Sequence, residues 1–226
     1  MRLLHQFRNK VKIKLGQFLC LLSLGIVLFP SCEKEQDPLP SYIQELAELH
    51  ADHSGVLRTL VSDRGESLGL VNPQPGFSSD SVYRAFTLYT KEQGGARLYQ
   101  MGGVASGCAV QMDSSAVQQS PVELISLWKT QSRWMNLHVR VNSGNKPQQL
   151  RWVWTRLEER ETTGCVTKML HLQIDSRPQS EPYHYTEEVY VSCPLTPFSN
   201  MLSKGKDSLT VTVNTTKGLL VRKFEY

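Results

Sequence analysis

Apolar and polar residues alternate along many short runs of this sequence, and no other feature limits the fold as strongly. In residues 137–141 and 209–213, every odd position is leucine or valine and every even position is polar. Successive side chains of a strand point to opposite faces, so this pattern predicts strands with one buried face. The strand-like runs span residues 55–61, 66–71, 81–89, 96–101, 104–112, 122–128, 133–141, 149–157, 166–174, 184–192, 209–214 and 219–226.

Turn-forming residues separate these runs, for example Ser-Asp-Arg-Gly at 62–65 and Asn-Ser-Gly-Asn at 142–145. Such residues initiate turns or tolerate positive φ. Short strands at these intervals favour a barrel or a sandwich over alternating strands and helices, and we expect an all-β chain. Residues 42–50 leave two alternatives open: one apolar stripe of a helix capped by Ser41, or the first strand.

The N-terminus carries a different pattern, a basic head followed by a short apolar run. Residues 1–31 contain five Lys or Arg and no acidic residue, and positions 15–29 are predominantly apolar. The run is shorter than the ~20 residues of a membrane-spanning helix, and a secretory signal has this arrangement. Because the run ends just before Cys32, it resembles a bacterial lipoprotein signal. We expect residues 1–31 to be the removed signal, Cys32 to be lipidated, and residues 32–41 to be a tether.

Lipidation of Cys32 would hold the mature chain on a membrane, since several acyl chains together give stable anchoring. The predicted location is the outer membrane of a Gram-negative cell envelope, facing the periplasm or the cell surface. The acidic stretch at 33–37 resembles a surface-export signal of some lipoproteins, and an ordinary solvated linker explains it equally well.

Removal of the signal changes the charge balance. The whole chain has 25 Lys and Arg against 21 Asp and Glu, and five of the cations lie in residues 1–31. The mature chain therefore carries 20 − 21 = −1. No basic patch remains to argue for a nucleic-acid partner.

The mature domains contain the cysteines Cys108, Cys165 and Cys193, whose spacing fits no zinc motif. Suppose that residues 166–174 and 184–192 form a hairpin. Cys165 and Cys193 then face each other only in a register that puts the apolar residues of the two strands on opposite faces. Hydrophobic burial favours the other register. We therefore expect three free thiols, each buried as a small apolar group.

A polar stretch without apolar periodicity, residues 115–121, predicts a domain boundary. It divides residues 42–118 from residues 119–226, and each length suits a small domain. All four tryptophans lie in the second part. Within residues 149–157, apolar side chains occupy both faces, as in a strand covered on both sides: Leu150, Trp152 and Trp154 on one face, Val153 and Leu157 on the other. We interpret the tryptophans as core residues rather than as a sugar-stacking platform.

Short segments in a fixed order make the chain resemble the NigD-like lipoproteins. After the lipid cysteine come Glu-Leu-His-Ala-Asp-His-Ser-Gly at 48–55 and Asp-Arg-Gly-Glu at 63–66. The second half contributes Ile-Ser-Leu-Trp at 125–128, Trp-Met-Asn-Leu at 134–137, Leu-His-Leu at 170–172, and the segments 213–215 and 224–226. The resemblance implies an N-terminal OB-like barrel followed by a C-terminal antiparallel β-sandwich. It carries over no catalytic residues, and the immunity role that the family name suggests is unproven.

Three short motifs suggest chemistry, and each has a simpler explanation. The His-Ala-Asp-His segment at 50–53 echoes part of a metallo-hydrolase motif, but a turn explains Asp52. Ser-Leu-Trp-Lys at 126–129 matches S-x-x-K, yet residues three apart on a strand point to opposite faces. His171 could face Glu187 across a hairpin as a titrating pair, although a solvated face is the more common outcome.

The sequence therefore assigns no catalytic residue, metal ligand or cofactor, and Cys32 is the functional residue that it names. The predicted function is a non-enzymatic, lipid-anchored envelope protein that binds an unidentified partner, either a protein, as an immunity factor does, or a glycan. A glycan-binding or glycan-processing accessory protein is the alternative, and an enzyme of unrecognised type is a second hypothesis. An enzyme should show a cleft with convergent polar groups of perturbed pKa, and a binding module an exposed apolar patch.

Overall fold

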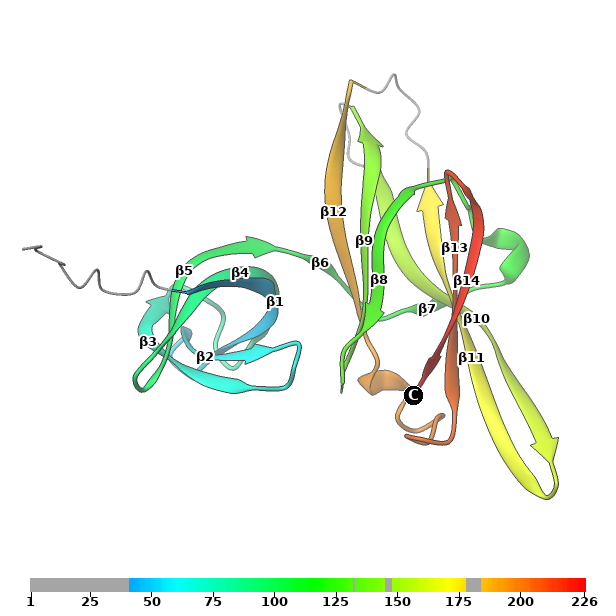
Figure 1. The fold of residues 1–226 in the computed structure, drawn as a ribbon, viewed down its shortest axis with the longest axis horizontal. Helices are drawn as coiled ribbons and strands as arrows, with labels where there is room; N and C mark the ends of the chain where they lie inside the picture. Colours follow the sequence, from blue (N-terminus) through cyan, green and yellow to red (C-terminus); the bar gives the residue numbers. More distant parts are fainter. Residues whose placement is uncertain (1–40, 132, 145–147, 178–183) are drawn as a thin grey trace, which may run out of the picture. The chain divides into compact units, whose positions relative to one another are not determined.

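A computed structural model describes residues 41–226 except residues 132, 145–147 and 178–183 (Figure 1). The predicted signal, Cys32 and nearly all of the predicted tether lie outside the described residues. Within the described part, no helix is long and apolar enough to cross a membrane. The chain is all-β, as the alternating pattern predicts, with a closed barrel followed by two further sheets.

The first five strands close into a barrel in the order β1-β2-β3-β5-β4, with β4 pairing back onto β1. This arrangement agrees with the OB-like barrel that the family resemblance implies. The strands are β1 Tyr42–Ala51, β2 Val56–Ser62, β3 Ser67–Pro75, β4 Val82–Glu92 and β5 Gly95–Gly103.

Residues 42–50, which the sequence left open, belong to strand β1. Four consecutive residues of this strand, from Leu46 to Leu49, are buried. β1 pairs along both edges, with β2 and β4, so a helix here would leave two strand edges of the barrel without a partner. The burial of both faces removes the alternation that identifies other strands, and this explains the ambiguity.

A glycine allows the barrel to close. β3 and β5 meet at a short parallel contact between Leu70 and Ala96. Gly95, just before this contact, has a φ of 154°, and a Cβ added there would overlap the carbonyl oxygen of Gly69. The close approach of the two backbones therefore requires glycine at this position.

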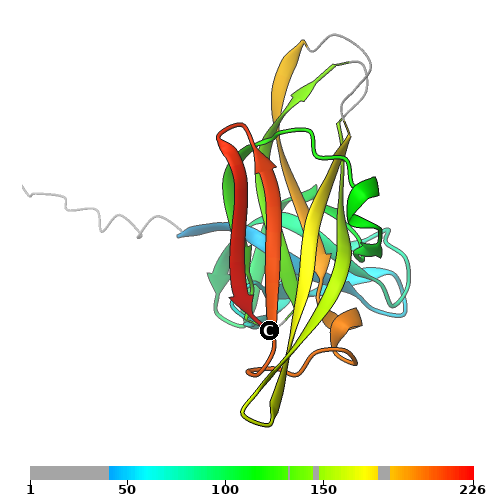
Figure 2. The same ribbon diagram turned by 90° about the vertical axis from the view of Figure 1, so that its right-hand side faces the viewer.

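The remaining strands form a sandwich of two sheets. One sheet has the order β14-β13-β11-β10-β7 and the other β6-β12-β9-β8. Figure 2 shows β14, β13, β11 and β10 side by side. The elements are β6 Ala105–Ser106, β7 Val110–Gln111, η1 Ser114–Ala116, β8 Glu123–Lys129, β9 Trp134–Ser143, β10 Gln149–Thr162, β11 Cys165–Arg177, β12 Tyr185–Pro194, η2 Thr196–Phe198, β13 Ser208–Thr215 and β14 Gly218–Glu225.

The sandwich core lies between the two sheets and contains the alternating leucines and valines of β9 and β13. Trp152 is buried in this core, as predicted, and its Nε1 donates to the backbone oxygen of Val191 at 3.2 Å. Leu157 packs against the same core, so its predicted position on the opposite face is wrong. A bulge between Trp154 and Arg156 inserts a residue into β10, and this extra residue moves every later side chain to the other face.

Strand pairing changes from barrel to sandwich between Gly103 and Ala105. The short strands β6 and β7 pair with β12 and β10 of the sandwich, although both precede the predicted boundary at 118–119. The connecting segment therefore takes part in both sandwich sheets. The division into residues 42–118 and 119–226 as separately folding domains stays a prediction, because strand pairing does not measure independent folding.

The predicted hairpin between residues 166–174 and 184–192 is wrong. β11 pairs with β10 and β13, whereas β12 pairs with β9 and β6 in the other sheet. Cys193 is buried, and this burial raises the pKa of its thiol to about 12. Cys165 lies at the tip of the β10–β11 hairpin and Cys108 lies in the connecting segment. Both are exposed, so the expectation of burial is wrong for these two thiols.

A buried arginine joins β4 of the barrel to β9 and β12 of the sandwich. Arg84 Nη1 lies 2.6 Å from Asp63 Oδ1, an ion pair whose geometry falls short of a hydrogen bond. Arg84 Nη2 donates to Asn136 Oδ1 at 3.0 Å, and Ser192 Oγ donates to the same oxygen at 2.7 Å. The Arg84 guanidinium carbon also lies 4.9 Å from the centroid of the Trp134 ring. This cluster satisfies a charge that would otherwise be buried without a partner.

Candidate functional site

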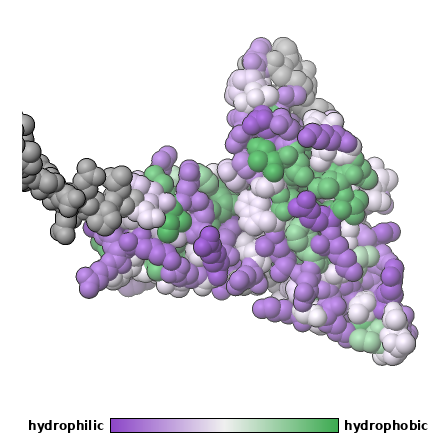
Figure 3. All heavy atoms as spheres, viewed as in Figure 1, coloured by the Kyte–Doolittle hydropathy of each residue, from purple (hydrophilic) through white to green (hydrophobic). Residues whose placement is uncertain are grey.

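The two sides of the sandwich differ in how the sheets meet. On one side, two backbone hydrogen bonds connect Val122, the residue before β8, to the β13–β14 hairpin: the Val122 N–H donates to the Asn214 oxygen at 3.1 Å, and the Thr216 N–H donates to the Val122 oxygen at 3.0 Å. Arg222 of β14 also donates to the backbone oxygen of Leu127 at 3.1 Å. Apolar surface gathers over β8, β13 and β14 in the view of Figure 3. Exposed apolar side chains of these strands include Ile125 in β8 and Val221 in β14.

On the other side, β10 and β12 enclose a cleft. Its cavity is about 600 Å³, a volume typical of ligand sites in proteins. The lining residues come from the end of β5, from β6, from the residue before β10, and from β10, β11 and β12: Gly103, Ala105, Gln148, Gln149, Leu150, Arg151, Asp175, Arg177, Glu187, Glu188, Val189, Tyr190 and Val191. We name this cavity the β10–β12 cleft.

Both strands that form the cleft have a partly open edge. β12 pairs with β9 along its full length, but on its other edge it pairs only with β6, at Val191 and Ser192. β10 likewise pairs with β7 only at Val153 and Trp154. Among the described residues, 185–190 of β12 and 149–152 of β10 have no strand partner on the cleft side. Such edges present backbone N–H and C=O groups to any extended chain that reaches them.

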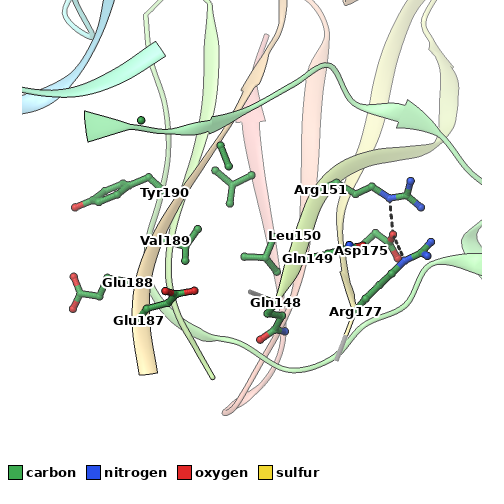
Figure 4. A pocket seen from close by; sticks show the side chains of 13 residues that line it. Gln148, Gln149, Leu150, Arg151, Asp175, Arg177, Glu187, Glu188, Val189 and Tyr190 are labelled. Atoms are coloured by element: carbon green, nitrogen blue, oxygen red, sulfur yellow. Dashed lines mark hydrogen bonds and ion pairs between the residues drawn. The ribbon is translucent and has the colours of Figure 1, made fainter. Parts of the chain in front are cut away.

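Two apolar side chains and one carboxylate of β10 and β12 point toward one another inside the cleft (Figure 4). Figure 4 shows Leu150, Glu187 and Val189 pointing into the space between the two strands, with Glu188 and Tyr190 on the far side of β12. Alternation along β12 explains this arrangement. Val191 is buried in the core, so Val189 and Glu187, two and four residues earlier, lie on the same face.

Glu187 has no hydrogen bond or ion pair with another described residue, and its side chain is half-buried. Its neighbour Glu188 differs. Glu188 accepts from Arg140 at 2.8 Å and contacts His138 at 3.1 Å. The hydrogen bond from Arg140 lowers the pKa of Glu188. The two adjacent carboxylates therefore have separate roles, one within a surface ion-pair network and one available in the cleft.

A second carboxylate beside the cleft is fully compensated. Asp175 accepts from the Gln118 N–H at 2.8 Å and from Arg151 Nε at 2.7 Å, with Arg177 Nε at 3.2 Å. Burial alone would raise the pKa of Asp175, but the Gln118 N–H and the two guanidinium groups lower it overall. Figure 4 shows these side chains grouped together on the far side of β10 from Val189. This trio fixes the β10–β11 wall of the cleft.

An aromatic stack covers the outer face of β12. The rings of Tyr190 and His138 are stacked with centroids 4.0 Å apart, and Phe86 of β4 stacks on Tyr190 at 5.3 Å. Burial raises the pKa of Tyr190. The stack supports the strand from the side that faces away from the cleft.

The histidine and aspartate motif of the sequence forms structure rather than a metal site. Asp52 accepts from the N–H groups of Ser54 and Val56 and from Arg58, and these hydrogen bonds lower its pKa to about 2, with the Arg58 contact the largest cause. Glu48 is buried, where it accepts from Trp134 Nε1 at 2.7 Å. No group of three candidate metal ligands occurs within the described residues.

The other two motifs also separate in the structure. Ser126 and Lys129 lie on strand β8, as the alternation predicts, without the helical spacing that S-x-x-K chemistry needs. His171 pairs with Glu158 of β10 at 3.2 Å, whereas Glu187 lies in the other sheet. His171 and Glu187 therefore do not face each other, and the possible titrating pair does not form.

Sequence reasoning did not single out the β10–β12 cleft. Its residues look like ordinary members of alternating strands, and only the order of strands in the two sheets shows which edges stay open. Glu187 is the one residue with a local signal, because it is a charged residue on the face that carries Val189 and Val191.

Comparison with solved structures shows a common fold. A NigD-like immunity protein from Bacteroides caccae is 18% identical, with a TM-score of 0.59 over 83% of this chain and 97% of that one. The chain shares the NigD-like fold. A protein of unknown function, DUF1344, from Bacteroides vulgatus is 17% identical, with a TM-score of 0.63 over 82% and 91% of the two chains. A candidate lipoprotein from Bacteroides fragilis is 11% identical, with a TM-score of 0.59 over 83% and 98%. No family model and no curated protein matches the sequence.

Proposed function

We propose that this chain is a lipid-anchored protein of the Gram-negative cell envelope that binds a protein partner in the β10–β12 cleft. The observation that carries the proposal is the cleft itself, which combines two open strand edges with an apolar interior and one unpaired carboxylate. Backbone edges and apolar side chains suit the recognition of an extended polypeptide more than the positioning of groups for catalysis.

Two further observations support this function. The sequence before Cys32 resembles a lipoprotein signal, and one structure with the same fold is named as a candidate lipoprotein. Another is named as a NigD-like immunity protein. Anchoring at Cys32 would keep the cleft at the membrane surface, where a secreted partner arrives.

Site-specific photo-crosslinking in living cells tests the proposal. A benzoylphenylalanine residue replaces Gln149, which is exposed at the rim of the cleft, in the full chain with Cys32 intact. The matched control places the same residue at Gln100, an exposed glutamine of barrel strand β5. Illumination is expected to give one discrete, protease-sensitive adduct at Gln149 and none at Gln100.

Other outcomes would reject the proposal. Equal crosslinking at both positions would mean that contacts are not specific to the cleft. The absence of an adduct at Gln149 would leave the cleft without a partner. An adduct whose added mass is removed by glycosidases would replace the protein partner with a glycan.

A further inference from the structure

The chain already adds a strand to the edge of β12. Within the connecting segment, β6 pairs in parallel with β12 through Ala105 with Val191 and Ser106 with Ser192. Gly107 extends the contact by donating to the Ser192 backbone oxygen at 3.2 Å. This edge is therefore geometrically able to accept a neighbouring strand, and β6 occupies only its last part.

We infer that residues 185–190 of β12 accept an extended, lysine- or arginine-bearing segment of a protein partner as an additional strand, with its basic side chain paired to Glu187. The inference rests on the proposed function and names the chemistry of its partner. Backbone hydrogen bonds supply affinity in this mode of binding, and side-chain pockets supply specificity.

Glu187 sets the charge of the partner. It points into the cleft and has no hydrogen bond or ion pair with another described residue. The nearby arginines do not neutralise the Glu187 carboxylate, because Arg151 and Arg177 both form ion pairs with Asp175. A basic side chain from an added strand would provide the missing counter-charge in a partly desolvated place.

The spacing along β12 predicts the pattern of the partner segment. Glu187 and Val189 lie on the same face, two residues apart, and both face Leu150 across the cleft. Directly opposed residues of paired strands share a face. The added strand should therefore carry its basic residue and an apolar residue at positions i and i+2.

The same carboxylate argues against a second copy of this chain as the occupant. Two copies of this chain that paired through their β12 edges would bring their Glu187 carboxylates together, and like charges opposed on a sheet are unfavourable. An inward charge is also a known way to discourage unwanted edge pairing. In that role Glu187 would disfavour any added strand because pairing would desolvate its carboxylate, and the experiment below separates this role from recognition.

The test uses seven-residue peptides, acetylated and amidated, in which threonine alternates with valine, lysine and valine. Binding to the purified Cys32→Ala chain is measured by fluorescence anisotropy. A second peptide has glutamate in place of the central lysine. We expect the lysine peptide to bind the chain at least about tenfold more tightly than the glutamate peptide.

Backbone methylation tests whether the peptide is a strand. Alternate amides of an edge strand point to opposite sides, so only one set donates to β12. N-methylation of that set should weaken binding at least about tenfold, and methylation of the complementary set should change it less than about twofold. Recognition through side chains alone predicts the same effect for both sets.

Charge reversal supplies the matched protein variants. Glu187→Lys should reverse the preference between the two peptides, whereas Glu161→Lys makes the same change at the exposed tip of the β10–β11 hairpin and should leave it unaltered. Thermal unfolding checks that both variants fold. A variant Glu187→Gln, with equal shape and no charge, should lose the preference without reversing it.

The two proposals fail differently. If Gln149 crosslinks in cells but the peptides do not bind, or bind without regard to charge or methylation, the strand-addition inference is wrong and the binding function stands. If neither crosslinks nor peptide binding occur, both are wrong. If Glu187→Gln aggregated and still preferred the lysine peptide over the glutamate peptide, Glu187 would be identified as a residue that prevents unwanted pairing at the β12 edge.

Discussion

Arg84 offers a quantitative test of how the barrel strand β4 is tied to the sandwich. Its side chain is 1% exposed and its partner Asp63 is 15% exposed. Replacing Arg84 with methionine keeps most of the volume but leaves Asp63 without its counter-ion. Breaking a buried pair by removing one partner costs about 3–5 kcal/mol. Asp63 keeps longer contacts to Trp128 and Asn136, at 3.4 and 3.3 Å, so we expect a value near the lower end, about 3 kcal/mol.

Urea unfolding, followed by tryptophan fluorescence, measures this loss. With a slope of about 2–3 kcal/mol per molar urea, the midpoint of Arg84→Met should fall by roughly 1 M or more. The control is Arg97→Met, which breaks the exposed pair of Arg97 with Glu92 and should cost less than about 1 kcal/mol. If Arg84→Met lowered the urea midpoint no more than the control, the claim that the buried Arg84 stabilises the contact between β4 and the sandwich would be refuted.

Four further predictions follow from single residues. Cys32→Ala should move the chain from the detergent phase to the aqueous phase in Triton X-114 partitioning, because it removes the acyl anchor; equal partitioning would reject lipidation. Gly95→Ala should lower the melting temperature by several degrees, because its Cβ overlaps the Gly69 carbonyl where the barrel closes; an unchanged melting temperature would show that the two backbones separate without cost. Asp175→Asn should destabilise the chain at pH 7. Because the folded pKa of Asp175 is lowered, its contribution is present above the unfolded pKa of about 3.9 and is lost as pH falls through the folded pKa. Urea titrations should therefore show the two proteins converging below about pH 4. Among the three cysteines of residues 41–226, a thiol reagent should label Cys108 and Cys165 in the native protein and also Cys193 after denaturation, because Cys193 is buried and the other two are exposed.

The strands of the sandwich could be predicted because their pattern is local. β13 alternates between apolar and polar residues from Ser208 to Asn214, and the structure places its leucine and valines in the core. Trp152 was likewise predicted as a core residue. In β13 the apolar residues all lie on one face and the polar residues on the other, so the sequence alone records which face meets the core.

The pairing of strands could not be predicted in the same way. β11 and β12 follow each other in the sequence, but β11 belongs to the five-stranded sheet and β12 to the four-stranded sheet. The supposed hairpin between them therefore does not form. The bulge in β10 moved Leu157 to the core face without a sequence signal that we recognised. The open edges of β10 and β12 depend on which strands are absent beside them, a property of the whole topology rather than of any segment.

Amide hydrogen exchange along β12 tests the central claim most directly. In the free chain, the amides of residues 185–190 that point toward β9 should be protected, and the alternate ones that point into the β10–β12 cleft should exchange quickly. Adding the lysine peptide should protect this second set and leave the first unchanged. Slow exchange of every amide in the free chain would show that the edge is already covered, and continued fast exchange with peptide bound would show that no strand is added. Either result would contradict the account.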